Sequence, residues 1–438
     1  KGNIIKTFTS MNLDEKIINA LKDLNYEEAT DIQKKAIPVA LKKRDVLAAA
    51  QSGTGKTAAF LLPIITEILE NKQPNTPILR ALILVPTREL ATQIAKAVED
   101  YAKYLDIEKL AVFGGVSAKE QERKIAKGID ILVATSGRLM EHIKNKSVDL
   151  SSVTTVVIDE VDTLLDMGFL EDIESILPNV GPHRQIMMFS ATMNQNVKKL
   201  AKEFLTDPVV IEVAQQRSAV KIIEQQIIEV DEAQKAPLLS YLIGSRNYSQ
   251  VLVFVNMKIE ADTLVEHLEL DGLPAACIHG DVRQTARAKA LKKFKSGDIR
   301  VLVATDIAAR GIDIQLLPVV VNYALPETVT DYTHRIGRTG RAGNPGTAIT
   351  LLSVKDYKMM IEIEKELIIN VPREVIEGFE TTEKKPRLFK ARPKQLSVKK
   401  AEAKKAAKKT GFTKTNAPVK TTKKRKTTKR DSNRSFGK

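Results

Sequence analysis

The stretch DVLAAAQSGTGKTAAFLLPIITEIL, residues 45–69, joins a short apolar run, a glycine-rich loop and a helix-like segment. The apolar run predicts a buried strand. The loop predicts a phosphate-binding turn, because backbone N–H groups and the first turn of a helix attract anionic oxygens. In such a turn Lys56 would reach the β- and γ-phosphates and Thr57 would place its hydroxyl on Mg²⁺. Gly53 and Gly55 would allow the backbone to come close.

A second apolar run ends in acidic residues, VVIDEVD at 156–162. Asp159 would hold the metal through water, and Glu160 would orient or deprotonate the attacking water. An Asp-Glu pair alone is weak evidence, because most such pairs are solvated surface charges. Together with the phosphate loop, the pair predicts an enzyme that hydrolyses a nucleoside triphosphate. A GTPase would need Asn-Lys-x-Asp to bind guanine, and the two Asn-Lys pairs continue as NKQP and NKSV.

Strand-like and helix-like segments alternate through most of the 438 residues, which predicts α/β domains with parallel sheets covered on both faces. We expect an N-terminal domain at 1–213, a linker at 214–221, a second domain at 222–372 and a tail at 373–438. The candidate strands are 45–50, 81–85, 110–113, 130–134, 154–158, 185–190 and 208–213, followed by 227–230, 251–256, 275–280, 300–305, 318–324 and 347–352.

The tetrapeptide LVAT occurs twice, ending at Thr135 and at Thr305. Buried strands of parallel sheets all read as Val/Ile/Leu runs, so the shared letters alone prove little. In two similar domains, however, each copy would be a strand whose carboxyl end delivers a polar loop to the crevice where open α/β sheets bind ligands.

The net charge of +15 is concentrated at the C-terminal end. Residues 381–438 hold 22 Lys/Arg and 3 Asp/Glu, a net of +19, whereas the remaining 47 basic and 51 acidic residues give −4. A segment so poor in apolar residues predicts disorder, and its charge favours nucleic acid as a partner. A solubilising tail with no partner is the alternative.

The single cysteine, Cys277, excludes a disulfide framework and a cysteine-rich zinc site. No apolar run approaches the length of a membrane span, and no apolar signal-peptide core is present at the N-terminus. We therefore expect a cytoplasmic protein without a membrane partner.

The segment YTHRIGRTGRAG (332–343) places Arg335, Arg338 and Arg341 three residues apart. Gly residues within the segment argue against an ordinary exposed helix. A loop with forked guanidinium groups suits the charge that develops on a transferring phosphoryl group. If this loop belongs to the second domain, hydrolysis requires the two domains to meet around the nucleotide.

These motifs, in this order, resemble those of the DEAD-box RNA helicases of superfamily two, most closely the bacterial RhlE-type branch. The resemblance spans residues 6–370 and implies two tandem RecA-like domains followed by the tail. It also rests on PTREL (86–90), GG (114–115), SAT (190–192), HGD (279–281) with Gln284 and Arg287, and ATDIAARGID (304–313).

The resemblance implies the roles of individual residues. Gln33 would bind the adenine edge with Phe8 stacking beside it, so that ATP is preferred to GTP, and Asp313 would contact the ribose. The implied ATP-binding set is Phe8, Tyr26, Thr30, Gln33, Gly53, Thr54, Gly55, Lys56, Thr57 and Asp313, with Thr57 and Asp159 at Mg²⁺. The implied catalytic set is Lys56, Asp159, Glu160, Arg338 and Arg341, the two arginines acting as arginine fingers.

The resemblance also implies a track for RNA phosphates across both domains. Backbone contacts position a strand without selecting its bases, and contacts to 2′-hydroxyls favour RNA over DNA. The implied RNA-binding residues are Arg88, Gly115, Thr135, Gly137, Arg138, Arg287 and Thr305. Ser190 and Thr192 would couple the ATP site to strand separation, and Arg335 would support contacts between the domains.

Four positions depart from the family pattern. Val161 replaces Ala in DEAD, for which we expect only a packing change. Asn25 and Ala29 replace Gly and Pro of the Q motif, and Asn tolerates a left-handed turn better than most residues. Ser136 replaces a common Pro, which predicts a less rigid loop there.

The predicted mechanism is closure of the domains by ATP and single-stranded RNA, each of which raises affinity for the other. A bent strand in the closed track would separate a duplex locally, and hydrolysis would reopen the cleft. Two alternatives stay open: a DNA helicase or translocase on the same scaffold, and an RNA-binding or annealing protein in which the tail acts. We expect a monomer, with precursor ribosomal RNA or the RNA degradation machinery as candidate partners.

Overall fold

The computed structural model describes residues 7–50, 53–71, 77–213, 223–310, 312, 314, 317–340 and 346–383. By their internal contacts, all of these described residues belong to one compact unit. The predicted linker and all of the tail after residue 383 lie outside the described residues, as do two predicted site residues, Asp313 and Arg341. We call the described residues up to 213 the first lobe and those from 223 onward the second lobe.

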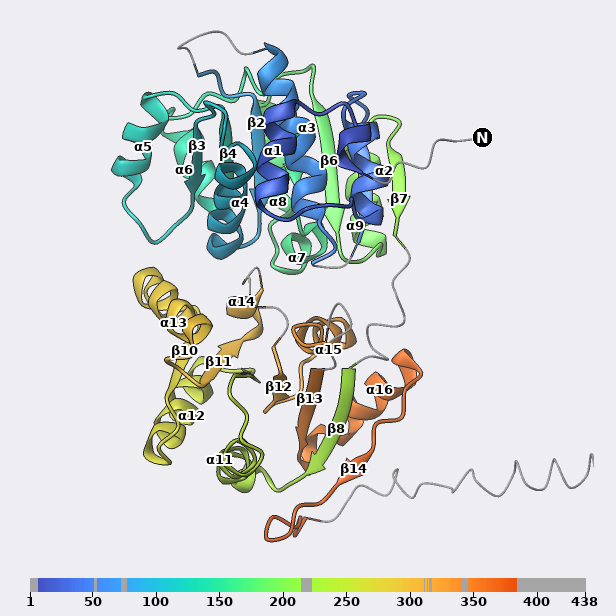
Figure 1. The fold of residues 1–438 in the computed structure, drawn as a ribbon. Coiled ribbons are helices and arrows are strands. Elements are labelled where there is room, and N and C mark those ends of the chain that lie inside the picture. The colour runs from blue at the N-terminus through green and yellow to red at the C-terminus, as the bar shows by residue number, and fades with distance from the viewer. Residues whose placement is uncertain are drawn as a thin grey trace, which may run out of the picture. The chain divides into compact units, whose positions relative to one another are not determined.

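The first lobe contains a seven-stranded parallel sheet with the order β3-β4-β2-β5-β6-β1-β7 (Figure 1). Each strand begins and ends within two residues of its predicted bounds, because a buried parallel strand is an almost continuous apolar run. The strands are β1 (Val46–Ala49), β2 (Ala81–Val85), β3 (Lys109–Val112), β4 (Ile131–Thr135), β5 (Thr155–Ile158), β6 (Gln185–Ser190) and β7 (Val209–Glu212).

The second lobe repeats this topology in the order β10-β11-β9-β12-β13-β8-β14. The two LVAT copies end β4 and β11, which hold the same position, next to the edge, in their respective sheets. The strands are β8 (Ile223–Glu229), β9 (Val251–Val255), β10 (Ala275–Ile278), β11 (Val301–Thr305), β12 (Val319–Asn322), β13 (Gly346–Leu352) and β14 (Arg373–Glu374). The predicted class, two tandem α/β domains with parallel sheets, is confirmed.

Two differences from the predicted strands have a physical cause. β8 begins at Ile223, four residues before its predicted start, because three of its first four residues, IEQQ, are polar and lack the apolar run that we used as the signal. β14 was not predicted, since two polar residues carry no strand pattern. It forms by backbone pairing, with Arg373 opposite Ile227 and Glu374 opposite Ile228.

Helices cover both faces of each sheet. Those of the first lobe are α1 (Glu15–Asp23), α2 (Asp31–Ala40), α3 (Lys56–Asn71), α4 (Arg88–Tyr101), α5 (Ala118–Ala126), α6 (Ser136–Lys144), α7 (Val161–Asp166), α8 (Leu170–Ile176) and α9 (Gln195–Phe204), with a 3₁₀ turn η1 (Phe8–Ser10) and another, η2 (Leu177–Asn179). Those of the second lobe are α11 (Lys235–Ser245), α12 (Lys258–Leu270), α13 (Gln284–Ser296), α14 (Asp306–Ala309), α15 (Val329–Ile336) and α16 (Tyr357–Leu367), with η3 (Glu232–Gln234) and η4 (Val354–Asp356).

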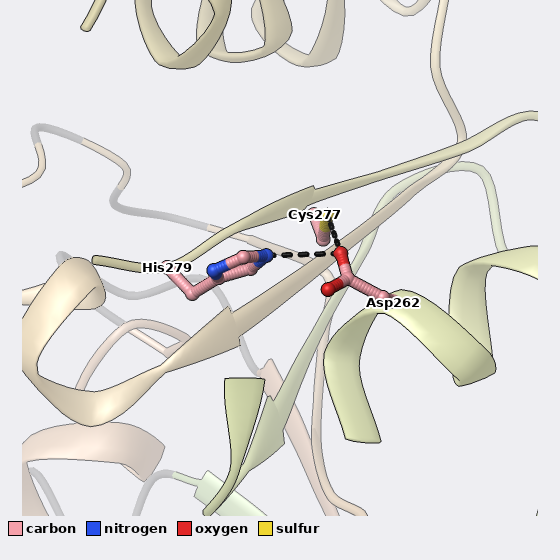
Figure 2. A group of neighbouring side chains, drawn as sticks. All are labelled: Asp262, Cys277 and His279. Carbon is pink, nitrogen blue, oxygen red and sulfur yellow. Dashed lines mark hydrogen bonds and ion pairs between the residues drawn. The ribbon is translucent and has the colours of Figure 1, made fainter. Parts of the chain in front are cut away.

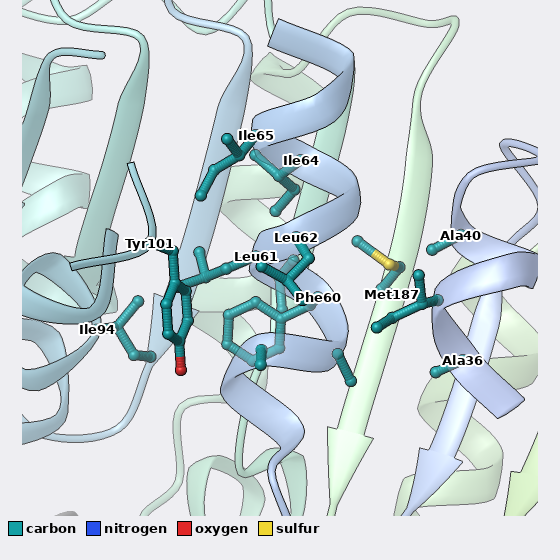
Figure 3. Packing of buried hydrophobic residues seen from close by; sticks show 14 of the residues in the cluster. Ala36, Ala40, Phe60, Leu61, Leu62, Ile64, Ile65, Ile94, Tyr101 and Met187 are labelled. Carbon is teal, nitrogen blue, oxygen red and sulfur yellow. The ribbon is translucent and has the colours of Figure 1, made fainter. Parts of the chain in front are cut away.

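Alternate residues of each strand supply the two cores of a lobe. Ile83 of β2 packs with α1–α4 on one face, whereas its neighbour Leu82 packs with α6–α9 on the other. Figure 3 shows part of the first core, where Phe60 of α3 lies between Tyr101 of α4 and Ala36 of α2. The sheets are thus buried on both faces, so we expect the functional side chains on the loops at the carboxyl ends of the strands.

No helix among the described residues is long and apolar enough to span a bilayer.

Candidate nucleotide and RNA site

The phosphate loop connects β1 to α3. Gly53 and Gly55 have φ of 78° and 94°, the left-handed region that glycine adopts without strain. A Cβ on Gly55 would lie 2.3 Å from Nε2 of Gln33, so a larger residue does not fit here. Lys56 begins α3 with a side chain that is 6% exposed, and its Nζ has no hydrogen-bond partner among the described residues. A buried ammonium without a partner is costly, and an anionic phosphate would satisfy it.

Gln33 joins the start of α2 to this loop. Its Oε1 accepts the backbone N–H of Thr30 at 2.8 Å, and its Nε2 donates to the backbone oxygen of Gly55 at 3.0 Å. A glutamine amide has a second N–H and a second lone pair to offer. That spare donor and spare acceptor match the edge of an adenine base. Asn25, two residues after the end of α1, has φ of 58°, the left-handed turn expected for it.

The acidic pair lies where β5 ends. Asp159 is buried, and its Oδ1 accepts the backbone N–H of Glu160 at 2.9 Å. Glu160 itself has φ of 51°, which turns the chain into α7. Burial raises the pKa of both carboxyl groups, and the nearby charge of Lys56 opposes the rise in both cases. The hydroxyl of Thr57 and the Asp159 carboxylate are oxygen ligands of the kind that Mg²⁺ prefers.

Asp162 links the acidic segment to the SAT segment at the end of β6. Its Oδ2 accepts the backbone N–H of Ala191 at 3.1 Å, and the N–H and hydroxyl of Thr192 at 2.9 and 3.0 Å. The Oγ of Ser190 also accepts the N–H of Thr192, at 3.3 Å. Thr192 is thus held by a residue two positions beyond the acidic pair. Asp162 was not among the predicted site residues, although it is the last residue of the DEVD motif.

The arginines of the second lobe differ in environment. Arg335 is 1% exposed in α15, where it forms an ion pair with Asp306 at 2.6 Å and donates to Oδ1 of Asn256 at 2.9 Å. Within the described part of the chain, its hydrogen-bond and ion-pair partners all belong to the second lobe, which differs from the expected contact between domains. The reason is that the segment up to Ile336 is helical and turns Arg335 inward, toward the ends of β9, β11 and β12.

Arg338 follows the end of α15 and lies on the nucleotide side of the second lobe. Its Nη1 donates to the backbone oxygen of Ile312 at 2.7 Å. Its charge lowers the pKa of Glu160, against the dominant effect of burial. Arg338 is therefore within electrostatic reach of the acidic pair.

A cleft of about 1190 Å³ receives side chains from both lobes. It is lined, among others, by Tyr26, Thr30, Gln33, Gly53, Gly55, Lys56, Thr57, Asp159, Glu160, Gln284, Ile312 and Arg338. Thr54 lies in the same loop. Phe8 is not part of the lining. It is 3% exposed within the first hydrophobic core, because η1 turns its ring inward, and this differs from the expected stacking position.

The residues predicted to bind RNA fall into two groups. In the first lobe, Arg88 begins α4 and lies over Gly115, where a Cβ would come within 2.3 Å of its Nη1. Arg138 donates to the backbone oxygen of Val116 at 3.0 Å, next to the same Gly115. Thr135 is the N-cap of α6, and a Cβ built on Gly137 meets no atom within 4 Å. The segment at Ser136 is the first turn of α6 rather than the less rigid loop that we expected.

In the second lobe, Thr305 is the N-cap of α14, the same role that Thr135 has in the first lobe. Arg287 is 8% exposed and forms an ion pair with Glu89 of the first lobe at 3.0 Å. Gln284 donates to the same carboxylate at 3.1 Å. Glu89, within PTREL, was not among the predicted site residues.

Comparisons with known proteins agree with this geometry. Residues 30–200 match the family model "DEAD/DEAH box helicase", and residues 234–343 match "Helicase conserved C-terminal domain". The chain is 41% identical over 359 residues to the DEAD-box ATP-dependent RNA helicase CshA of Bacillus subtilis, covering 82% of this chain and 72% of that protein. The chain belongs to the DEAD-box ATP-dependent RNA helicase family. It is therefore an ATP-hydrolysing enzyme that acts on RNA.

Further relatives of this DEAD-box helicase support the same assignment. CshA of Bacillus licheniformis is 42% identical, over 82% of this chain and 73% of that protein. The structure of S. cerevisiae Dbp5 bound to RNA and ADP BeF3 superimposes with a TM-score of 0.76 at 29% identity, over 84% of this chain and 96% of that one. The family resemblance drawn from the motifs is thus confirmed. The two Bacillus relatives are CshA proteins and do not support the RhlE-type branch specifically.

The helicase also carries a cluster of possible metal ligands outside the cleft. Asp262 of α12, Cys277 of β10 and His279 have ligand atoms within 4.8 Å of one another (Figure 2). Oδ1 of Asp262 accepts from Nε2 of His279 at 2.9 Å and from the Cys277 thiol at 3.2 Å. These two hydrogen bonds account for the cluster, so we interpret it as a structural link between α12 and the edge strand β10.

The Cys277 thiol should react slowly in the folded helicase. Burial, reinforced by the Asp262 carboxylate, raises its pKa to about 12, so little thiolate is present at neutral pH. We expect alkylation by iodoacetamide to be roughly a hundredfold slower in the native protein than in denaturant, because the thiolate is the nucleophile. Mass spectrometry of the alkylated fraction over time measures this. Equal rates in the two states would contradict the assignment, and Asp262→Asn should accelerate the native reaction.

Proposed function

We propose that the chain binds ATP in the cleft and hydrolyses it when RNA joins the two lobes. The observation that carries the proposal is the buried Lys56, whose Nζ has no hydrogen-bond partner in the described part of the chain, in a cleft shared with Asp159, Glu160 and Arg338. One lobe would supply the lysine and the carboxylates, and the other the guanidinium. Hydrolysis would then depend on the two lobes being together, which makes the nucleotide a link between them.

The proposed roles in the ATP site follow from the contacts. Lys56 would bind the β- and γ-phosphates, while Thr57 and Asp159 would hold Mg²⁺. Glu160 would orient and deprotonate the attacking water. Gln33 would bind adenine through its spare donor and acceptor, with Tyr26 and Thr30 beside it. Asp313 and Arg341 keep their proposed roles at the ribose and the γ-phosphate.

The proposed RNA track uses the residues around Gly115 in the first lobe and those around Thr305 in the second. Helix N-termini at α4 and α6, with Arg88 and Arg138 in their first turns, favour phosphate contacts. In the structure Arg287 is engaged by Glu89, so we propose that it steadies the closed arrangement as well as the RNA. Ser190 and Thr192, held by Asp162, would transmit closure to the track. Unwinding would be local rather than processive.

Several finer assignments are also proposals. We propose a CshA-like rather than RhlE-type enzyme, because both Bacillus relatives named above are CshA proteins. We further propose a monomer with domains at 1–213 and 222–372, joined by a linker at 214–221. The basic tail would add affinity for RNA, and precursor ribosomal RNA or the RNA degradation machinery are candidate partners.

The test compares nucleic acids as activators of ATP hydrolysis. With saturating single-stranded RNA the rate should rise by about tenfold or more over the RNA-free rate, whereas DNA of the same sequence should have little effect, because 2′-hydroxyl contacts distinguish the two. A coupled phosphate-release assay measures both rates, and a gel assay with a short RNA duplex measures unwinding. A rate indifferent to RNA would contradict the proposed coupling, and equal activation by DNA would favour a DNA helicase.

A further inference from the structure

Gln121, in α5, is a junction between three segments of the first lobe. It is 5% exposed, and its Nε2 donates to the backbone oxygen of Phe113 at 3.1 Å. Its Oε1 accepts from Nη1 of Arg138 at 2.9 Å and lies 3.1 Å from Nε2 of His142. One amide therefore connects the end of β3, just before Gly114–Gly115, with two positions of α6.

The chemistry of the partners fixes the orientation of this amide. Arginine can only donate hydrogen bonds, so the Gln121 atom that faces Arg138 must be the oxygen. The Nε2 of His142, which faces the same oxygen, must then carry a proton. His142 is fully buried, and its Nδ1 lies 2.8 Å from Oγ of Ser147, which can donate to it. Every polar atom of the Gln121 and His142 side chains thus has a partner.

The same contacts restrict Arg138. Its Nη1 also donates to the backbone oxygen of Val116, and its Nε lies 2.8 Å from the Glu141 carboxylate. Its side chain is only 10% exposed, so it is folded against the Phe113–Val116 turn. Among the described residues, Nη2 has no hydrogen bond or ion pair, and it is the atom that could meet a phosphate. Its direction is set by the bonds on Nη1, and one of those bonds depends on Gln121.

We propose that Gln121, supported by His142, is a positioning residue for RNA binding. It holds Arg138 and the Phe113–Val116 turn in the arrangement that a phosphate would meet. The inference rests on the proposed RNA track and adds to it two buried residues that do not touch RNA themselves. Preorganisation of this kind lowers the cost of ordering the arginine on binding.

The experiment measures RNA affinity in the full chain. A short fluorescein-labelled oligouridylate is titrated by anisotropy with ADP and beryllium fluoride present, and ATP hydrolysis is measured against RNA concentration. Gln121→Leu should weaken RNA binding by about tenfold, the effect of a lost hydrogen bond to a charged group. The RNA concentration for half-maximal ATPase should rise by about the same factor, with a change in the maximal rate of less than about twofold.

A rescue variant and a double variant distinguish a positioning role of Gln121 from a general loss of structure. Gln121→Glu keeps an acceptor for Arg138 and should retain affinity within about threefold of native. The double variant with Arg138→Ala should bind no more weakly than Arg138→Ala alone, because the two residues act through one contact. The matched control is Gln185→Leu. Gln185 is also 5% exposed, and it donates to the backbone oxygens of Ala40 and Arg44, so its loss should lower the Tm without changing RNA affinity.

The outcomes distinguish this inference from the proposed track. If Arg138→Ala binds RNA as tightly as the native chain, the track assignment of Arg138 fails. If Arg138→Ala weakens binding but Gln121→Leu does not, the positioning role is overturned. If Gln121→Leu does not fold, His142→Phe decides the question. A loss of affinity of about threefold supports the positioning role, and native affinity overturns it.

Discussion

Replacing Glu160 by Gln should lower the maximal rate of RNA-stimulated ATP hydrolysis by about a thousandfold. Gln has nearly the same shape but cannot take a proton from the attacking water. Burial raises the pKa of Glu160, which makes its carboxylate a stronger base than an exposed glutamate, and the charges of Lys56 and Arg338 oppose this rise. ATP binding should persist, because Lys56 and the phosphate loop are unchanged.

The same variant should be more stable than the native chain near neutral pH. A carboxyl group whose pKa is raised on folding loses folded-state stability as pH rises through that pKa, because the buried charge is disfavoured. Gln removes this cost, so the Tm should rise, and the difference should shrink as the pH falls and Glu160 becomes protonated. Glu174→Gln, on the exposed face of α8, is the control and should change neither rate nor Tm. A Glu160→Gln enzyme with native turnover would remove Glu160 from the mechanism.

The sequence was sufficient for features that local patterns encode. Apolar runs located nearly all the strands, because a strand that is buried on both faces needs apolar side chains at almost every position. The phosphate loop was recognisable because Gly53, Gly55 and Lys56 stand between a strand and a helix, and the geometry needs that order. The repeated LVAT marked equivalent strands, β4 and β11. Each strand ends in a threonine, Thr135 or Thr305, that occupies the N-cap position of the following helix.

Features that depend on distant partners could not be predicted in this way. The environment of Arg335 is set by Asp306 and Asn256, which lie 29 and 79 residues away along the chain. The family motif implied that Arg335 supports contacts between the domains. In the structure, the end of α15 separates this buried arginine from Arg338 at the cleft. Glu89 gains its importance from Arg287 in the other lobe. No local pattern carries that information.

Replacing Arg338 by Ala should reduce ATP turnover by about a thousandfold or more, the loss expected when an arginine that stabilises the transferring phosphoryl group is removed. The affinity for ATP should change much less, because the charge that Arg338 neutralises develops mainly in the transition state. Arg338→Lys should turn over ATP less than about tenfold faster than Arg338→Ala, since an ammonium cannot reproduce the planar fork of the guanidinium. Single-turnover hydrolysis with saturating RNA separates the chemical step from binding.

Arg335 supplies the internal comparison for this prediction. Arg335→Ala leaves Asp306 without its buried partner and should cost about 3–5 kcal/mol of folding free energy. Arg338→Ala should leave the Tm within a few degrees of native, because its side chain is half-buried at the cleft rather than enclosed in a core. The two alanine variants should therefore differ: Arg335→Ala should lower the folding free energy, whereas Arg338→Ala should fold normally and lose turnover. Native turnover in a folded Arg338→Ala enzyme would mean that Arg338 of the second lobe contributes no charge to hydrolysis. The proposed dependence of hydrolysis on closure of the two lobes would then have no physical basis.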